Sequence, residues 1–483
     1  MAFSDLRAYI SKLEEEGELQ RVRKEVDWNL EVGAIYRRCL DIGAPAPLFE
    51  RIRGYPEGYR VFAAPVGPSN KPNRYYARLA TALGIRPESS ASHIIEEYIR
   101  RKKAPLKPVL VSGGPCKENV HLGEEVDLLE FPVPLFHGGD GGRFMGTWCS
   151  VITRDPDTGW VNYGTYRMMV HDRQTSGISI LPPQHIGLHY YQKYEARSMP
   201  MECAVAIGPE PLTSLMSGMQ APTGVDEADI VGGLRQEPLE LVKCETVNLS
   251  VPATSEIVLE GVVPPHERRV EGPFGEYAGY MGRGVPAEPV FHVKAITHRN
   301  DPILAVQCHG VPVDDYHLFG SLFRAGELLD YLRSQGFPVK SVYIPPSGVT
   351  HMTVVSTRVP QANYAMFLAQ AIWGSHIGKY SWFLVITDDD IDVTDMNQVV
   401  WAISTRCHPD RGIFKVPRTA GHPRLPFQSQ YERQHYMGSQ VLIDCTWPRE
   451  WEYVPETASF TGLWPKEIQE KVLNTWEEYG FSA

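Results

Sequence analysis

Apolar residues recur at helical spacing near the start of the chain. Four of them lie three or four positions apart: Phe3, Leu6, Ile10 and Leu13. The spacing predicts an amphipathic helix that Ser4 caps and Gly17 ends. The sequence up to about residue 110 then mixes helical patterns with short strands bounded by proline and glycine. We therefore expect a small α/β unit at the amino terminus.

The middle of the chain alternates apolar and polar positions with a period of two. Residues 255–263 (SEIVLEGVV) are rich in β-branched side chains, and Phe291, Val293 and Ala295 alternate roughly with polar neighbours. Glycine and proline punctuate this region heavily, as in HGGDGG at 137–142. Many short strands of this kind favour a barrel or a sandwich.

The last third of the chain returns to alternating helices and strands. Residues 363–373 predict a buried helix, and the apolar run 382–386 before Asp388 to Asp390 predicts a buried parallel strand. A final amphipathic helix is expected over 465–479. Its apolar face would carry Ile468, Val472 and Trp476. Two interpretations of this helix stay open: it docks on a partner subunit, or it packs on its own domain.

Composition narrows the possible functions only a little. The chain has 483 residues, enough for about three domains, and we place them at 1–112, 113–310 and 311–483. The formal net charge of −11 argues against general nucleic-acid binding, which needs a basic face. The eight cysteines form no CxxC pair, and no apolar run is long enough for a membrane span. We expect a reduced, cytoplasmic protein that binds neither nucleic acid nor membrane.

Two polar segments in the β-rich middle are candidates for chemistry. The first, NYGTYR, ends in Arg167 within a strand-like run over 160–171. A half-buried guanidinium needs an anionic partner, such as a substrate carboxylate or phosphate; the alternatives are a structural salt bridge or a side chain that faces outward. The second, EGPFGE, brings Glu271 and Glu276 together around a Gly-Pro turn, so that both can point into one cavity. Two carboxylates that repel each other would leave one protonated as a general acid, although an exposed polar loop is the alternative.

Longer strings identify the chain as similar to the UbiD family of reversible decarboxylases, close to the ferulate and heteroaromatic-acid branch. They include DLRAYISKLEEEGEL (5–19), ENVHLGEEVDLLEFPVPLFHGGDGGRF (118–144), EGPFGEYAGY (271–280) and DDDIDVTDMNQVVWAISTRCHP (388–409). The resemblance implies a mixed α+β chain in three parts: an amino-terminal α/β domain, a central split β-barrel that holds the cofactor, and a carboxy-terminal α/β domain with a terminal helix. The implied cofactors are prenylated FMN, Mn²⁺ and K⁺.

The resemblance also assigns residues. It implies that Arg167, Glu271 and Glu276 are catalytic and that Asn162, His185 and Glu227 bind the metal, a ligand set that spacing alone would not have suggested. The other implied cofactor contacts are Thr165, Tyr166, Gln184, Ser217 and Met219. The lysine expected for the cofactor phosphate is replaced by Trp382 and Phe383, so Lys379 is its candidate substitute. The expected substrate pocket holds Leu181, Tyr277, Tyr316, His317 and Phe319, with helix capping as the alternative role of His317.

The activity implied by the resemblance is reversible, non-oxidative decarboxylation through a covalent adduct with prenylated FMN. Arg167 would bind the carboxylate of an aromatic, heteroaromatic or α,β-unsaturated acid, and Glu276 would transfer the proton. The implied partners are this acid, CO₂, a flavin prenyltransferase that supplies the cofactor, and further copies of the chain in a homodimer or homohexamer. Two other functions stay open: an FMN-binding redox protein on the same barrel, and a subunit of a multi-component carboxylase.

Overall fold

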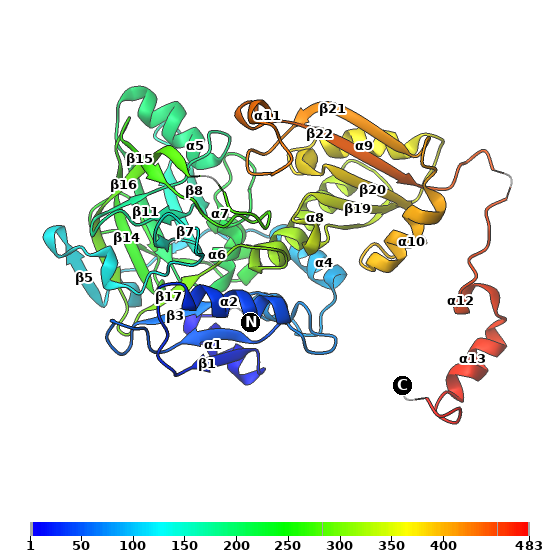
Figure 1. The fold of residues 1–483 in the computed structure, drawn as a ribbon, viewed down its shortest axis with the longest axis horizontal. Coiled ribbons are helices and arrows are strands. Elements are labelled where there is room, and N and C mark those ends of the chain that lie inside the picture. Colours follow the sequence, from blue (N-terminus) through cyan, green and yellow to red (C-terminus); the bar gives the residue numbers. More distant parts are fainter. Residues whose placement is uncertain (1–2, 283, 452, 482–483) are drawn as a thin grey trace.

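The computed structural model describes residues 3–282, 284–451 and 453–481, which form an amino-terminal unit, a large β-rich unit and a carboxy-terminal α/β unit. Figure 1 shows the first two units stacked on each other, with the third beside them and the chain end extending away. One continuous apolar core runs through all three units. Among the helices of the described residues, none has the length and apolar character that crossing a membrane requires.

The amino-terminal unit is a four-stranded sheet with helices around it. Its elements are α1 (Leu6–Glu15), β1 (Leu19–Val22), α2 (Glu31–Ile42), β2 (Ala46–Phe49), β3 (Arg60–Ala63), α3 (Ala77–Ala82) and α4 (Ala91–Lys102). The first helix buries Leu6, Ile10 and Leu13 as predicted, but Asp5 caps it instead of Ser4. The Asp5 carboxylate, a strong acceptor, takes the free N–H of Ala8 at 2.8 Å.

The fourth strand of this sheet comes from much later in the chain. Strand β17 (Ile303–Val306) pairs in parallel with β3, in the order β1-β2-β3-β17. All four of its residues are buried. A segment that we placed in the central domain therefore belongs to the amino-terminal sheet.

The central unit is built around an eight-stranded sheet with the path β10-β16-β14-β11-β7-β8, while β15 and β5 also pair with β16. Its strands are β4 (Val109–Leu110), β5 (Asn119–Leu122), β6 (Phe144–Met145), β7 (Cys149–Arg154), β8 (Val161–Gly164), β9 (Met168–Met169), β10 (Thr175–Gly177), β11 (Met201–Ile207), β12 (Glu240–Lys243), β13 (Ser250–Pro252), β14 (Ile257–Val263), β15 (Arg268–Glu271) and β16 (Val285–His298). Its α-helices are α5 (His185–His189), α6 (Pro211–Ser217) and α7 (Glu227–Arg235). Among the described residues, no ladder joins β8 to β10 to close this sheet.

The strand expected over 160–171 is broken in the structure. Strand β8 lies in the large sheet, whereas β9 pairs with β6 in a separate two-stranded sheet. Between them the Thr165 N–H donates to the carbonyl of Ser217 at 2.8 Å, which turns the chain out of the large sheet. Arg167 therefore lies in a connection between two sheets and not on a strand.

The carboxy-terminal unit contains a five-stranded sheet in the order β18-β19-β20-β22-β21. Its elements are α8 (Asp315–Ser334), β18 (Val339–Tyr343), β19 (Met352–Thr357), α9 (Tyr364–Gly374), β20 (Phe383–Asp388), α10 (Met396–Arg406), β21 (Ile413–Ala420), α11 (Gln430–His435), β22 (Met437–Cys445), α12 (Phe460–Leu463) and α13 (Lys466–Asn474). The predicted apolar strand is β20, which pairs in parallel with both β19 and β22. The predicted terminal helix is shorter than expected: α13 ends at Asn474 and has no buried residue.

Candidate active site

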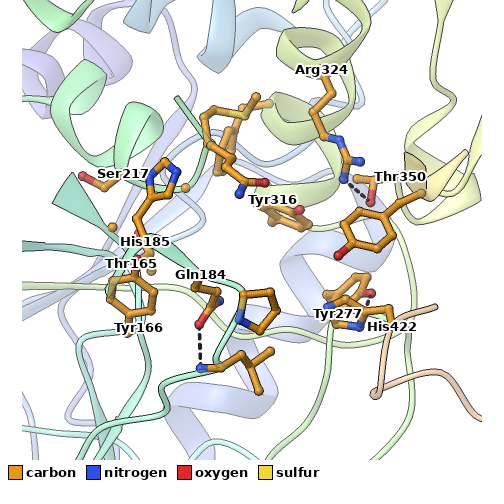
Figure 2. A pocket seen from close by; sticks show the side chains of 18 of the residues that line it. Thr165, Tyr166, Gln184, His185, Ser217, Tyr277, Tyr316, Arg324, Thr350 and His422 are labelled. Atoms are coloured by element: carbon orange, nitrogen blue, oxygen red, sulfur yellow. Dashed lines mark hydrogen bonds between the residues drawn. The ribbon is translucent and has the colours of Figure 1, made fainter. Parts of the chain in front are cut away.

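A cavity of about 330 Å³ lies between the central and carboxy-terminal units. Its walls hold most of the expected cofactor and pocket residues: Asn162, Thr165, Tyr166, Leu181, Gln184, His185, Ser217, Met219, Tyr277, Tyr316, Phe319 and Lys379. Figure 2 shows His185 and Ser217 on one side of this space and Tyr277 and His422 on the other. A smaller cavity of about 100 Å³ contains Arg167 and Glu276 and shares Thr165, Gln184 and Arg424 with the first. Most of the expected residues thus line two cavities that share lining residues, whereas Glu227, Glu271 and His317 line neither.

The guanidinium of Arg167 is held by both expected glutamates. Its Nε and Nη2 donate to the two carboxylate oxygens of Glu271 at 3.0 and 2.8 Å, and its Nη1 donates to Oε1 of Glu276 at 2.5 Å. The other oxygen of Glu276 accepts from Nη1 of Arg424 at 2.9 Å. Glu271 is fully buried and Glu276 nearly so. This is a buried chain of alternating charges in which Glu276 lies between two arginines.

Loop geometry presents the two glutamates to Arg167. Glu271 ends β15, and Gly272 then adopts a φ of +80° that a side chain would disfavour. The HGGDGG segment braces the same turn, because the carboxylate of Asp140 accepts the Gly275 N–H at 3.2 Å and the His137 N–H at 2.9 Å. From the sequence, that segment was noted only for its glycines and as part of the string 118–144.

The charges around Glu276 correct one expectation from the sequence. Burial opposes ionisation of Glu276, but the charges of Arg424 and Arg167 outweigh it and lower its pKa below the ordinary value. The two glutamates do not repel each other directly, since the Arg167 guanidinium separates them. In the free protein Glu276 is therefore a carboxylate and not a stored acid. A third carboxyl nearby, Glu288, keeps its proton to higher pH than usual: burial and the charge of Glu271 raise its pKa to about 7.

Of the expected metal ligands, Asn162 and His185 line the larger cavity, whereas the buried Glu227 lies beside His185 and does not line it. Oε2 of Glu227 accepts the Tyr163 N–H at 2.8 Å, and Oε1 lies 3.8 Å from Nδ1 of His185. Burial raises the pKa of Glu227. The Nε2 atom of His185 is buried, and no partner for it lies among the described residues. A buried carboxylate, an unpartnered imidazole nitrogen and the amide of Asn162 on adjoining β8 fit a divalent cation.

Two positively charged side chains line the same cavity. Lys379 and Arg324 both line the cavity, and neither forms an ion pair with a carboxylate of the described residues. Burial and the nearby Arg324 lower the pKa of Lys379. Within the described part of the chain, the Arg324 guanidinium donates only to neutral oxygens, those of Thr350 at 3.3 Å and Ile377 at 3.4 Å. Two cations without anionic partners are suited to bind a phosphate group.

One expected pocket residue, His317, does not line either cavity. It is fully buried as the third residue of α8. Its Nδ1 accepts the Asp314 N–H at 3.0 Å, and its Nε2 donates to the carbonyl of Tyr277 at 2.6 Å. A histidine at this position completes a capping box and has no ring atom left for a ligand. The capping role is the correct one, and through it His317 fixes the backbone of Tyr277.

Two histidines that the sequence did not single out take its place around the pocket. The hydroxyl of Tyr277 lies 2.9 Å from Nε2 of His351 and 3.3 Å from Nδ1 of His422. Burial lowers the pKa of His422 to about 3 and that of His351 well below its ordinary value, so both rings are neutral at pH 7. With Tyr316 and Phe319 they form a largely aromatic, uncharged wall.

Family models match the chain in three consecutive segments. They are described as the amino-terminal domain of 3-octaprenyl-4-hydroxybenzoate carboxy-lyase (residues 10–98), its Rift-related domain (107–312) and its carboxy-terminal domain (317–445). The chain belongs to the UbiD family. The resemblance inferred from the sequence is thereby confirmed, and the protein is a carboxy-lyase of this family.

Individual relatives extend over the whole UbiD chain. The pyrrole-2-carboxylic acid decarboxylase of Pseudomonas aeruginosa is 37% identical over 489 aligned residues, which cover 99% of this chain and 98% of the relative. The vanillic acid decarboxylase of Sedimentibacter hydroxybenzoicus in its closed form superposes with a TM-score of 0.87 at 30% identity, covering 99% of both chains. An evolved dimeric form of HmfF from Pelotomaculum thermopropionicum, in complex with prFMN, gives 0.77 at 32% identity, covering 93% of this chain and 96% of that one.

The site residues that the sequence missed come from the third unit. Arg424 follows the turn-rich Gly421 to Pro423, and Arg324 lies on the inner side of α8. Neither stands in a segment whose pattern indicates chemistry, and only the folding of the carboxy-terminal unit against the sheet brings them to the cavity. The turn residues Gly421 and Pro423 beside Arg424 are a weak signal, and Arg324, within α8, has none.

Proposed function

We propose that this UbiD protein catalyses the reversible, non-oxidative decarboxylation of an aromatic, heteroaromatic or α,β-unsaturated acid with prenylated FMN in the larger cavity. The observation that carries the proposal is the buried guanidinium of Arg167, shared by Glu271 and Glu276 where the two cavities meet. A plain FMN redox protein has no use for such a set, whereas a decarboxylase must hold an anion and deliver a proton.

The cofactor would lie with its phosphate at the cationic side of the cavity. Asn162, His185 and Glu227 would hold Mn²⁺ against the phosphate, and Lys379 would contribute charge there together with Arg324. Ser217 and Met219 would hold K⁺, while Thr165, Tyr166 and Gln184 would contact the flavin. When bound, prenylated FMN supplies the electron sink that a carboxylate on an sp² carbon lacks.

The protein's own residues would bind the substrate and move the proton. The substrate carboxylate competes with Glu276 for the N–H donors of Arg167 and Arg424, since the number of donors on each guanidinium is limited. Once Glu276 loses those partners and gains a negative neighbour, its pKa rises and it takes up a proton. Glu271 keeps Arg167 in place throughout, through its two hydrogen bonds. After CO₂ has left, Glu276 delivers the proton to the vacated carbon.

The pocket wall supports a small aromatic or heteroaromatic acid as substrate. Tyr277, Tyr316 and Phe319 offer ring faces and edges, while neutral His351 and His422 offer hydrogen bonds without charge. Leu181 adds an apolar contact at the mouth. The acids named for the relatives, pyrrole-2-carboxylic acid and vanillic acid, are of this kind.

The wider organisation follows from the same proposal. We assign the split-barrel cofactor domain to 113–310, with α/β domains at 1–112 and 311–483, although β17 crosses into the first of these. A separate flavin prenyltransferase would supply the cofactor. The exposed apolar side chains of the terminal segment, among them Trp464 and Trp476, support assembly into a homodimer or homohexamer.

Co-expression with a flavin prenyltransferase tests the function directly. The mass and absorbance of the bound cofactor are measured, together with CO₂ release from a panel that includes pyrrole-2-carboxylic, vanillic and ferulic acids. Prenylated FMN with release of CO₂ from at least one aromatic acid is the expected result. A protein that binds only unmodified FMN and releases no CO₂ would refute the proposal in favour of the redox alternative.

A further inference from the structure

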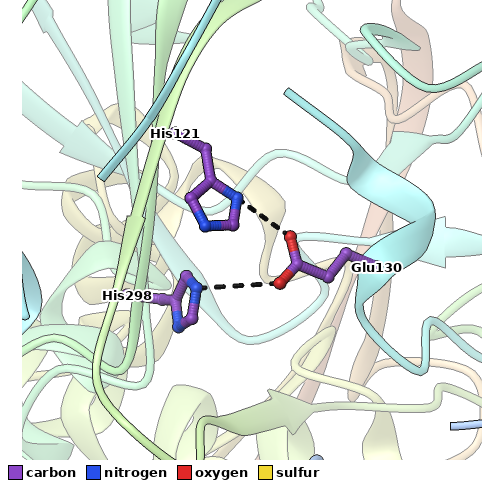
Figure 3. Close-up of side chains that lie close together, drawn as sticks. All are labelled: His121, Glu130 and His298. Atoms are coloured by element: carbon purple, nitrogen blue, oxygen red, sulfur yellow. Dashed lines mark ion pairs between the residues drawn. The ribbon is translucent and has the colours of Figure 1, made fainter. Parts of the chain in front are cut away.

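A second cluster of ligating side chains lies on the outer part of the large sheet. Strand β5 pairs antiparallel with β16 so that His121 faces Ile296, and His298 lies two residues further on the same face. Glu130, in the short 3-10 turn Leu128–Glu130, points between the two imidazoles. Figure 3 shows both rings directed at its carboxylate. This cluster shares no residue with either active-site cavity.

One contact in this cluster brings two lone pairs together with no proton between them. His298 Nδ1 lies 2.8 Å from the carbonyl of Arg299, which can only accept, so Nδ1 carries the ring proton. The Nε2 lone pair then faces Oε1 of Glu130 at 3.8 Å. That nitrogen is buried and has no hydrogen-bond partner among the described residues, and the whole side chain is only 5% exposed.

The remaining contacts bring the ligand atoms of all three residues close to one another. His121 Nδ1 lies 3.1 Å from Oε2 of Glu130, and one ligand atom from each of the three residues falls within 4.8 Å of the others. Ligands at about 2.1 Å from a tetrahedral zinc ion are separated by about 3.4 Å, a value between the two histidine–carboxylate distances, which involve different oxygens of Glu130. Tyr59 donates its hydroxyl to Oε1 of Glu130 at 2.6 Å, as an outer partner that orients a ligating carboxylate does.

We propose that His121, Glu130 and His298 form a binding site for a divalent transition-metal ion of the Zn²⁺ class, separate from the cofactor site. Two imidazoles and one carboxylate are a zinc ligand set that leaves a fourth position for water. His121 and Glu130 are 28% and 24% exposed, so that position can be reached from solvent. The ion would tie β5 and the 128–130 turn to the end of β16.

The place of the site on β16 separates its effect from catalysis. Strand β15, which ends in Glu271, pairs with the beginning of β16, whereas His298 is its last residue. At about 3.3 Å per residue these points are roughly 40 Å apart along the strand. We therefore expect the ion to raise the melting temperature without changing turnover.

Zinc titration of the full-length protein tests the proposal. After treatment with a chelator and dialysis, bound Zn²⁺ per chain and its affinity are measured by elemental analysis and by competition with a chromophoric chelator. His121→Gln and Glu130→Gln should each lose one equivalent, with affinity lowered more than about 100-fold, because even outer partners cost 10- to 100-fold. Tyr59→Phe should weaken binding by about 10- to 100-fold. Folding of each metal-free variant is checked by its melting temperature.

Two controls make the result decisive. His292→Gln removes another histidine of β16, one that pairs only with Glu267 at 2.8 Å, and should keep the full zinc content. His185→Gln removes a ligand of the proposed cofactor metal and should leave the second equivalent in place. The proposal is overturned if His121→Gln and Glu130→Gln bind zinc like the parent protein. It is equally overturned if all the zinc of the parent protein disappears in His185→Gln.

Discussion

A substitution of Arg424 tests whether its positive charge helps to bind the substrate carboxylate. It reaches from the carboxy-terminal unit to the central one, donating to Glu276 at 2.9 Å and to the Ser179 hydroxyl at 3.0 Å. In our account it shares the incoming substrate carboxylate with Arg167. Replacing Arg424 by glutamine keeps much of the side-chain volume and removes the charge. One charge-assisted hydrogen bond to the substrate is then lost.

The expected size of the effect follows from this contact. A hydrogen bond to a charged group contributes about 1.5–3 kcal/mol. Arg424 is 25% exposed, so water screens part of its charge and the lower half of that range, about 1.5–2 kcal/mol, applies. At 1.36 kcal/mol per factor of ten, kcat/KM should fall by about 10- to 30-fold. Most of the change should appear in KM, because Arg424 holds the acid and transfers no proton.

Steady-state rates of CO₂ release, normalised to the cofactor content of each preparation, measure this effect. Arg411→Gln serves as the matched control, since Arg411 is an exposed arginine of the same unit and lies outside both cavities. It should remain within about twofold of the parent enzyme. A kcat/KM for Arg424→Gln equal to that of the control would refute the assigned role. A loss of activity that disappears entirely when the rates are corrected for cofactor content would also refute this role, since Arg424 would then act on the flavin.

Three further predictions concern the surroundings of the site. Glu288 has a folded-state pKa of about 7, above its unfolded value, so its contribution to stability is lost as the pH rises through 7. In thermal scans, the melting temperature of the parent protein should therefore fall between pH 5 and pH 8. The melting temperature of Glu288→Gln should fall less over the same range. An equal fall in both proteins would remove Glu288 as the cause. Lys379→Gln should weaken cofactor retention about 10-fold or more during gel filtration, with Arg324→Gln behaving alike; full flavin content in both would contradict a phosphate site between them. His185→Gln should lose bound manganese, measured by elemental analysis, by about 100-fold in affinity, whereas unchanged manganese would place the metal elsewhere.

Local patterns predicted the elements of the fold better than their connections. The period-two residues of β14 and β16 and the apolar run of β20 appear where expected, because burial of alternate or consecutive apolar side chains is a local property. The transfer of β17 to the amino-terminal sheet was not predictable, since any short apolar strand can fill any open edge. The same holds for the break after β8, which depends on the carbonyl of Ser217, far along the chain.

The candidate site was predictable only as far as the family resemblance reached. Arg167, Glu271 and Glu276 were named together, yet their separations in sequence carry no sign of the ion-pair chain that joins them. One of the two glutamates was expected to keep its proton through mutual repulsion, but the pKa of Glu276 is lowered by Arg424, which comes from another unit, and by Arg167. His317 was misplaced because a capping box and a pocket residue look alike in sequence. Tertiary contacts decide both cases.

The measurement that tests the central claim most directly is the turnover of Glu276→Gln loaded with prenylated FMN. The variant keeps the shape of the side chain and one acceptor oxygen but cannot deliver a proton. With the cofactor present at the parent level, shown by absorbance and mass, CO₂ release from an accepted aromatic acid should fall by about 10²- to 10⁴-fold. Turnover within twofold of the parent enzyme at equal cofactor content would contradict the account and exclude Glu276 as the proton donor.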